Sequence, residues 1–107
     1  MSDAFSDREK GFEAKFKNDA DFIFKAESRR NRLLGEWLAD QFGIKGDAKE
    51  NYAKDVVVAD LDEPGIEDVV RKVMADIKAK SSPISETDVR AKIVELDAVA
   101  IEQLKNA

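Results

Sequence analysis

Apolar residues recur at three- and four-residue steps through most of the chain from residue 20 onward, which is the repeat of an amphipathic α-helix. The longest such stretch runs from Ala20 to Phe42, where Gly43 follows as a candidate left-handed C-cap and Ile44 can supply a hydrophobic contact. Its apolar positions are Ile23, Ala26, Leu33, Leu34, Trp37, Leu38 and Phe42, with Phe22 and Phe24 beside them. We therefore expect one long helix with a wide apolar face.

Three shorter amphipathic helices are expected after it, over about 48–61, about 66–79, and from residue 86 to near the end of the chain. Their apolar positions are Tyr52, Ala53, Val56, Val57 and Leu61, then Ile66, Val69, Val70, Val73, Met74 and Ile77, and finally Val89, Ile93, Leu96, Ala100 and Leu104. Four such stripes joined by short loops predict an all-α fold. We expect a four-helix bundle over 20–107, monomeric when free, packed around the Leu33–Phe42 half of the first helix.

Capping and breaking residues mark the ends of these helices. Asp47 is the candidate N-cap of the second helix, and Ser85 with Asp88 matches a capping box at the start of the fourth. Pro64-Gly65 and Ser81-Ser82-Pro83 break the chain on either side of the third helix.

Two local patterns allow other interpretations. Val56-Val57-Val58 alone would suit a strand, but its neighbours keep the helical period, so a helix is favoured. The acidic residues near Pro64-Gly65 resemble a calcium loop, but Arg71 would stand where such a loop requires a bidentate glutamate. These acids are better explained as a solvated helix end and as favourable charge at the start of the third helix. They are Asp60, Asp62, Glu63, Glu67 and Asp68.

Residues 1–19 are expected to form a separate N-terminal arm. On a helix, Phe5, Phe12 and Phe16 would fall within about 40° of one another and make an apolar stripe. Charged residues dominate the rest of the arm, and an isolated helix of this length is marginal in water. We expect an amphipathic arm that is partly disordered, or continues the first helix, and folds on a partner. The alternative is that the phenylalanines pack on the bundle.

Composition excludes most familiar catalytic and metal sites. The chain of 107 residues has no cysteine and no histidine, so disulfides, zinc sites and Ser-His or Cys-His nucleophilic pairs are excluded. The net charge is −5, with 18 basic and 23 acidic residues well mixed, which argues against nucleic acid as a partner. No apolar run reaches the roughly 20 residues that cross a bilayer. We expect a cytoplasmic protein that is not membrane-inserted, with no catalytic residue, required cofactor or metal site.

Arg29, Arg30 and Arg32 form the candidate ligand-binding cluster of the long helix. Guanidinium groups bind phosphates and carboxylates through paired hydrogen bonds. The three project in different directions from a helix, so they cannot all share one site, and Arg30 falls near the apolar stripe. The alternative interpretation is a set of exposed arginines paired with Glu27 and Glu36 at helical spacing.

Three blocks of the sequence carry a resemblance to a known family. They are Asp7-Arg8-Glu9-Lys10-Gly11-Phe12-Glu13-Ala14-Lys15-Phe16, the segment Lys25 to Gly46 around Arg29-Arg30-Asn31-Arg32-Leu33-Leu34-Gly35, and Tyr52-Ala53-Lys54-Asp55-Val56-Val57 through Glu63-Pro64-Gly65 to Asp68-Val69. In these blocks the chain resembles the zeta subunit of the alphaproteobacterial ATP synthase, a small inhibitor of its ATPase activity. Gly11 and Glu36 depart from the family pattern, in which we expect alanine and an apolar residue.

The resemblance implies that a four-helix body presents an inhibitory arm. The arm, 1–19, would insert at a catalytic interface between alpha and beta subunits, near gamma, and block rotation in the hydrolysis direction while allowing synthesis. The protein would then lie peripheral to the inner membrane through the ATP synthase. The apolar anchors would be Phe5, Phe12 and Phe16, and the polar contacts Arg8, Glu9, Lys10 and Lys15.

The resemblance also gives the arginine cluster a candidate ligand. Some family members are thought to bind ATP or ADP, which would make Arg29, Arg30 and Arg32 a regulatory nucleotide site. A nucleotide-binding regulatory protein, or a generic helical interaction module, is therefore the alternative to the inhibitory subunit.

Overall fold

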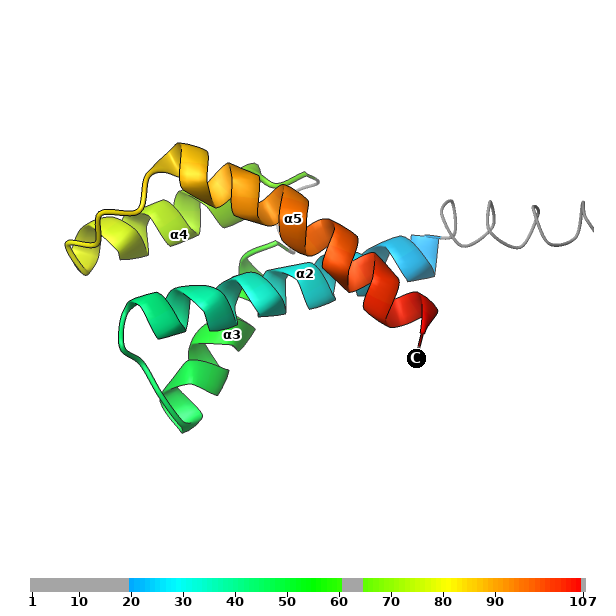
Figure 1. Cartoon of the computed structure of the whole chain (residues 1–107), viewed down its shortest axis with the longest axis horizontal. Helices are drawn as coiled ribbons and strands as arrows, with labels where there is room; N and C mark the ends of the chain where they lie inside the picture. Colours follow the sequence, from blue (N-terminus) through cyan, green and yellow to red (C-terminus); the bar gives the residue numbers. More distant parts are fainter. Residues whose placement is uncertain (1–19, 61–64, 107) are drawn as a thin grey trace, which may run out of the picture.

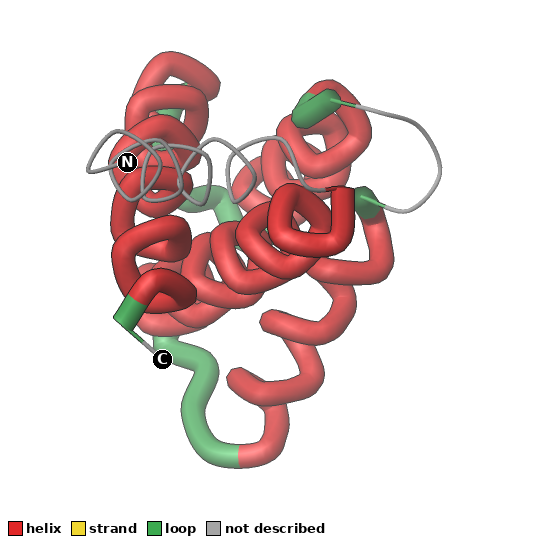
Figure 2. Tube along the Cα trace, turned by 90° about the vertical axis from the view of Figure 1, so that its right-hand side faces the viewer, coloured by secondary structure: helices red, strands yellow, loops and turns green. Residues whose placement is uncertain are grey.

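The computed structural model of the protein describes residues 20–60 and 65–106, and these ranges contain four α-helices and no strand. The helices are α2 (Ala20–Gln41), α3 (Asp47–Ala59), α4 (Glu67–Ala79) and α5 (Glu86–Lys105). Figure 2, turned by 90° from Figure 1, shows in green the loops that join α2 to α3 and α4 to α5. The expected all-α, four-helix fold is confirmed. The arm, 1–19, lies outside the described residues, so its separation from the body stays a prediction.

The helix α2 is the central element of the body. It packs against both α3 and α5. The helix α4 also packs against α3 and α5 (Figure 1). The buried core is made of Leu34, Leu38, Val56, Val69, Val70, Val73, Ile77, Val89 and Ile93, with Trp37, Phe42, Tyr52, Ile66, Met74, Ile84 and Leu96 packed around it. The α2 residues in this cluster all come from its Leu33–Phe42 half, as the sequence predicts.

The start of α2 has a different register from the one expected. Ile23 is 39% exposed, whereas Phe22 and Ala26 are buried. The buried face here steps by four residues from Phe22 through Ala26 to Arg30, which turns Ile23 outward. Leu33, also expected in the core, is only half-buried, because the face it occupies is incompletely covered by α3 and α5.

The C-terminus of α2 ends as the sequence predicts. Gly43 adopts φ 75°, its N–H donates to the Asp40 carbonyl at 3.2 Å, and the Ile44 N–H donates to the Ala39 carbonyl at 2.8 Å. These two bonds make a Schellman motif, which satisfies carbonyls that the helix itself leaves unpaired.

Two N-caps behave differently. The capping box at the start of α5 is confirmed, with the Asp88 N–H donating to Ser85 Oγ at 3.1 Å and the Ser85 N–H donating to Asp88 Oδ2 at 3.2 Å. The prediction that Asp47 caps α3 is wrong: Gly46 is the N-cap, and Asp47 lies in the first turn. There the negative charge of Asp47 still stabilises the helix N-terminus.

The run Val56-Val57-Val58 lies within α3, which confirms it as helical.

Gly35 brings α2 and α3 into close contact. A Cβ atom at Gly35 would lie 2.6 Å from the Ala53 Cα and 3.2 Å from the Val56 Cγ2. Two helix backbones can approach this closely only where neither carries a large side chain, so this pair fixes where α2 and α3 cross.

Candidate functional site

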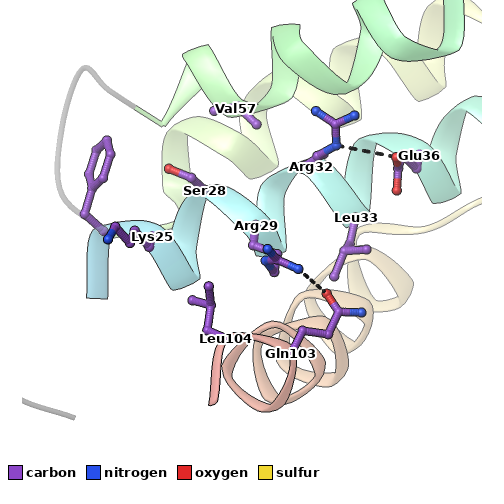
Figure 3. A pocket seen from close by; sticks show the side chains of 10 residues that line it. Lys25, Ser28, Arg29, Arg32, Leu33, Glu36, Val57, Gln103 and Leu104 are labelled. Atoms are coloured by element: carbon purple, nitrogen blue, oxygen red, sulfur yellow. Dashed lines mark hydrogen bonds and ion pairs between the residues drawn. The ribbon is translucent and has the colours of Figure 1, made fainter. Parts of the chain in front are cut away.

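A groove follows the outer face of α2, with Val57 of α3 on one side and Gln103 and Leu104 of α5 on the other (Figure 3). Its volume is about 590 Å³. The residues that α2 contributes are Phe24, Lys25, Ser28, Arg29, Arg32, Leu33 and Glu36. They recur at three- and four-residue steps, so one face of the helix forms the floor and the two neighbouring helices form the walls.

The charged residues of the groove differ in what they bind. Arg32 pairs with Glu36 at 3.6 Å and with Glu50 of α3, and the hydrogen bond to Glu50 raises the pKa of the Arg32 guanidinium. Arg29 instead donates from Nη1 to Oε1 of Gln103 at 3.1 Å, which is a neutral acceptor. Arg29 can therefore bind an anion without first giving up a carboxylate partner in the described body.

Arg30 lies outside this groove. Its side chain is 8% exposed, with Nη2 at 3.7 Å from Asp60 Oδ2 at the end of α3 and Nη1 at 3.5 Å from Asp97 Oδ1 on α5. Its Nε donates to Oδ1 of the buried Asn31 at 3.1 Å. A single guanidinium from the middle of α2 thus contacts residues of α5 and of the C-terminal end of α3.

Glu27 adds a third carboxyl to this buried cluster. Burial, followed by the proximity of Asp60, raises the pKa of the Glu27 carboxyl above its usual value. Arg30 lowers the same pKa, but it faces Asp60 and Asp97 as well and does not cancel the other effects. Ionisation of Glu27 is therefore less favourable in the folded protein than in water.

The interpretation of Asp60 as part of a solvated helix end is wrong. Its side chain is 8% exposed, because it turns inward toward Arg30. Glu67 and Asp68 do lie in the first turn of α4, where acidic charge was expected. Asp62 and Glu63 lie outside the described residues.

The structure brings Arg29 and Arg32 into one groove and sends Arg30 into the protein, in keeping with the expectation that the three cannot share a site. The Arg32–Glu36 pair of the alternative interpretation is present. It also accounts for a polar residue at 36, because that position lies on the groove rather than in the core.

The sequence did not single out Val57, Gln103 and Leu104 as groove residues. Val57 and Leu104 follow the apolar pattern of their helices and were assigned to the core, yet each is only half-buried at a groove wall. No local signal marks Gln103, since it meets Arg29 from 74 residues away.

The predicted partner-binding residues of the arm cannot be placed, since they lie outside the described residues. They are Phe5, Arg8, Glu9, Lys10, Phe12, Lys15 and Phe16. Their roles stay predictions.

Comparison with known proteins identifies the family. The family model described as ATPase inhibitor subunit zeta matches residues 1–103. A chain whose structure was solved by solution NMR is 49% identical with a TM-score of 0.70, and the match covers 78% of this chain and 94% of that chain. No match was found among curated proteins. Because the family model spans nearly the whole sequence, arm and body together, the chain belongs to the ATPase inhibitor subunit zeta family.

Proposed function

We propose that the chain inhibits ATP hydrolysis by the ATP synthase through its arm, residues 1–19. The arm enters a catalytic interface between an alpha and a beta subunit, near gamma, and blocks rotation in the hydrolysis direction while allowing synthesis. The family is that of an inhibitory subunit, which implies association with the ATP synthase. The observation that carries the proposal is that the family model begins at residue 1 and includes the whole arm.

Within the arm, the side chains divide by chemistry. Phe5, Phe12 and Phe16 supply the apolar anchors, because a helix places them on one face. The polar contacts come from residues beside this face, which are Arg8, Glu9, Lys10 and Lys15. The arm acts by occupying space between moving subunits and needs no catalytic residue of its own.

The body, residues 20–107, holds the arm at the catalytic head. In this proposal the protein is a monomer when free and lies on the cytoplasmic side, peripheral to the inner membrane through the synthase. None of the helices described here is long and apolar enough to cross a bilayer.

The proposal is tested with the catalytic head of an alphaproteobacterial ATP synthase freed of its own inhibitor. The concentration of chain that halves ATP hydrolysis is measured for the wild type, for the double variant Phe12→Ala/Phe16→Ala and for Asn18→Ala as a control. Truncating two apolar anchors raises that concentration by at least about tenfold, whereas the control changes little. Equal inhibition by all three proteins would refute the role of the apolar stripe, and no inhibition by the wild type would refute the function.

A second candidate function, a regulatory response to ATP or ADP, is favoured by the groove. Arg29 and Arg32 lie there together with Lys25, and the volume of about 590 Å³ is within the range of small-molecule sites. Phosphate groups would bind the two guanidiniums, with Arg30 excluded by its burial. Amide chemical shifts recorded during titration with ATP would move at Ser28, Arg29 and Arg32. An unchanged spectrum at millimolar nucleotide would contradict this candidate.

A further inference from the structure

We propose that the α2 groove is the docking site of the body on the ATP synthase catalytic head. The occupant is an amphipathic helix of an alpha or beta subunit that carries a carboxylate beside its apolar face. This inference rests on the proposed function, because it takes the arm and the body to engage the same partner.

The shape of the groove suits a helix. Its floor runs along α2 from Phe24 to Glu36, which at 1.5 Å per residue is about 18 Å or three turns, and α3 and α5 flank it on both sides (Figure 3). The apolar residues of the lining come from all three helices and are Phe24, Leu33, Val57 and Leu104. A surface of this kind receives the apolar face of a helix through contacts at three- and four-residue spacing.

Phe24 is the largest of the exposed hydrophobic side chains among the described residues. It lines the groove with 55% of its surface exposed, although aromatic side chains are usually largely buried. Exposed aromatic and arginine side chains together are typical of the residues that dominate binding energy in protein interfaces. Phe24 and Arg29 lie in the same groove and match this description.

Arg29 is the residue of the groove best placed to receive a carboxylate from a partner. Of the three cations in the lining, Lys25 pairs with Asp21 at 3.1 Å and Arg32 pairs with Glu36 and Glu50, whereas Arg29 has no carboxylate partner among the described residues. Because Arg29 binds a neutral amide, a carboxylate on the partner would gain a charge-assisted hydrogen bond without displacing an ion pair.

The position of the groove favours the partner that holds the arm. Residues 1–19 lead directly into Ala20, where α2 begins, and Phe24 follows one helical turn later. The distance from Ala20 to Phe24 along the helix axis is about 6 Å. A subunit that binds the end of the arm would therefore also lie close to the groove. A nucleotide would engage the cations of the groove but would leave most of its apolar floor uncovered.

The experiment compares substitutions inside and outside the groove in the ATP hydrolysis assay. Phe24→Ser and Arg29→Glu change groove residues, while Val94→Ser makes a matched change on α5, where Val94 is 72% exposed and away from the groove. Each groove variant is expected to raise the half-inhibitory concentration by about tenfold, with Val94→Ser unchanged. Circular dichroism and thermal melting of each variant separate weaker docking from misfolding.

The outcomes distinguish docking through the groove from inhibition by the arm. If the wild type inhibits and well-folded groove variants inhibit equally well, the groove is not the docking site, while the function of the arm stands. If the wild type does not inhibit, both proposals fail.

A photo-crosslinking residue at Ser28 identifies the occupant directly, because Ser28 lies on the groove floor. Crosslinking of the full chain to an alpha or beta subunit in the inhibited complex supports the proposal. Products formed only with a second copy of this chain, or only within the chain itself, overturn it. So does the absence of any product in a complex that is fully inhibited.

Discussion

The Arg30 side chain shows how one residue can take part in structure rather than recognition. Its sequence neighbours Arg29 and Arg32 point into the groove, while its own guanidinium is buried among Glu27, Asp60 and Asp97. Burying a charge is costly unless carboxylates and hydrogen bonds surround it, and here they come from the end of α3 and from α5. The cluster links the middle of α2 to α5 and to the C-terminal end of α3.

The cluster makes stability depend on pH through Glu27. The pKa of the Glu27 carboxyl is raised in the folded protein, so the folded state binds its proton more tightly than the unfolded state does. The resulting contribution to the free energy of unfolding is fully present below the unfolded pKa of about 4.3. It is lost as the pH rises through the folded pKa. Glu27→Gln mimics the neutral carboxyl. We expect the variant to melt at a higher temperature than the wild type at pH 7, with the difference shrinking toward pH 4. A difference that is independent of pH, or of the opposite sign, would contradict this role for Glu27.

Ser81 carries backbone strain that glycine would relieve. It has φ 53°, and the N–H groups of Ser81 and Ser82 close a Schellman motif on the carbonyls of Lys78 and Ile77. Because a left-handed conformation disfavours residues with a Cβ, Ser81→Gly should raise the free energy of unfolding by about 0.5–1 kcal/mol. Ser82→Gly, without a positive φ, should lower it by a similar amount through unfolded-chain entropy. Chemical denaturation measures the free energy of unfolding of both variants. If Ser82→Gly stabilises the protein and Ser81→Gly does not, Ser81 is not the strained residue.

At the scale of elements, the crossing of α2 over α3 depends on the absence of a side chain at Gly35. The atom nearest to an added Cβ is the Ala53 Cα, which belongs to the backbone of the neighbouring helix and cannot rotate away. Relief of the clash would require α3 to shift, and with it Val56 in the core and Val57 on the groove wall.

Gly35→Ala should therefore destabilise the protein although alanine favours a helix by about 1 kcal/mol. Because the clash is with backbone, we expect overpacking to cost about 3 kcal/mol, so the free energy of unfolding falls by a net amount of about 2 kcal/mol. Urea denaturation gives this quantity, and Gln41→Ala, at an exposed site on the same helix, serves as the control. An unchanged or increased stability of Gly35→Ala would show that α2 and α3 do not approach as closely as described.

Periodicity was sufficient to predict the elements but not all of their surfaces. The register of α4 is confirmed because Val69, Val70, Val73 and Ile77 repeat cleanly and one side of the helix is covered. The start of α2 was harder, since Phe22, Ile23 and Phe24 are adjacent and apolarity alone does not say which one faces inward. In the structure Phe22 is buried, while Ile23 and Phe24 are exposed.

The candidate site was less predictable than the fold. The sequence identified Arg29 and Arg32 as residues of interest, but it could not show that the groove around them is closed by Val57, Gln103 and Leu104. These residues belong to helices far apart along the chain, and tertiary packing brings them together. The inward turn of Asp60 toward Arg30 was missed for the same reason.

At the scale of the whole molecule, the four described helices share one core cluster. Among the described residues, the members of this cluster lie within 34–96, and α2 contributes to it from its C-terminal half. We therefore propose that the body provides stability and the arm provides inhibition, with α2 following the arm directly in the chain. This division predicts that the chain beginning at residue 20 folds without the residues before it.

The central claim is tested most directly by ATP hydrolysis of the inhibitor-free catalytic head in the presence of either the full chain or the chain from residue 20 onward. Circular dichroism first establishes that both proteins are helical and melt cooperatively. The account predicts inhibition by the full chain and none by the shortened one at the same concentration. If the folded, shortened chain inhibits as strongly as the full chain, the arm is not the inhibitory element and the account is wrong.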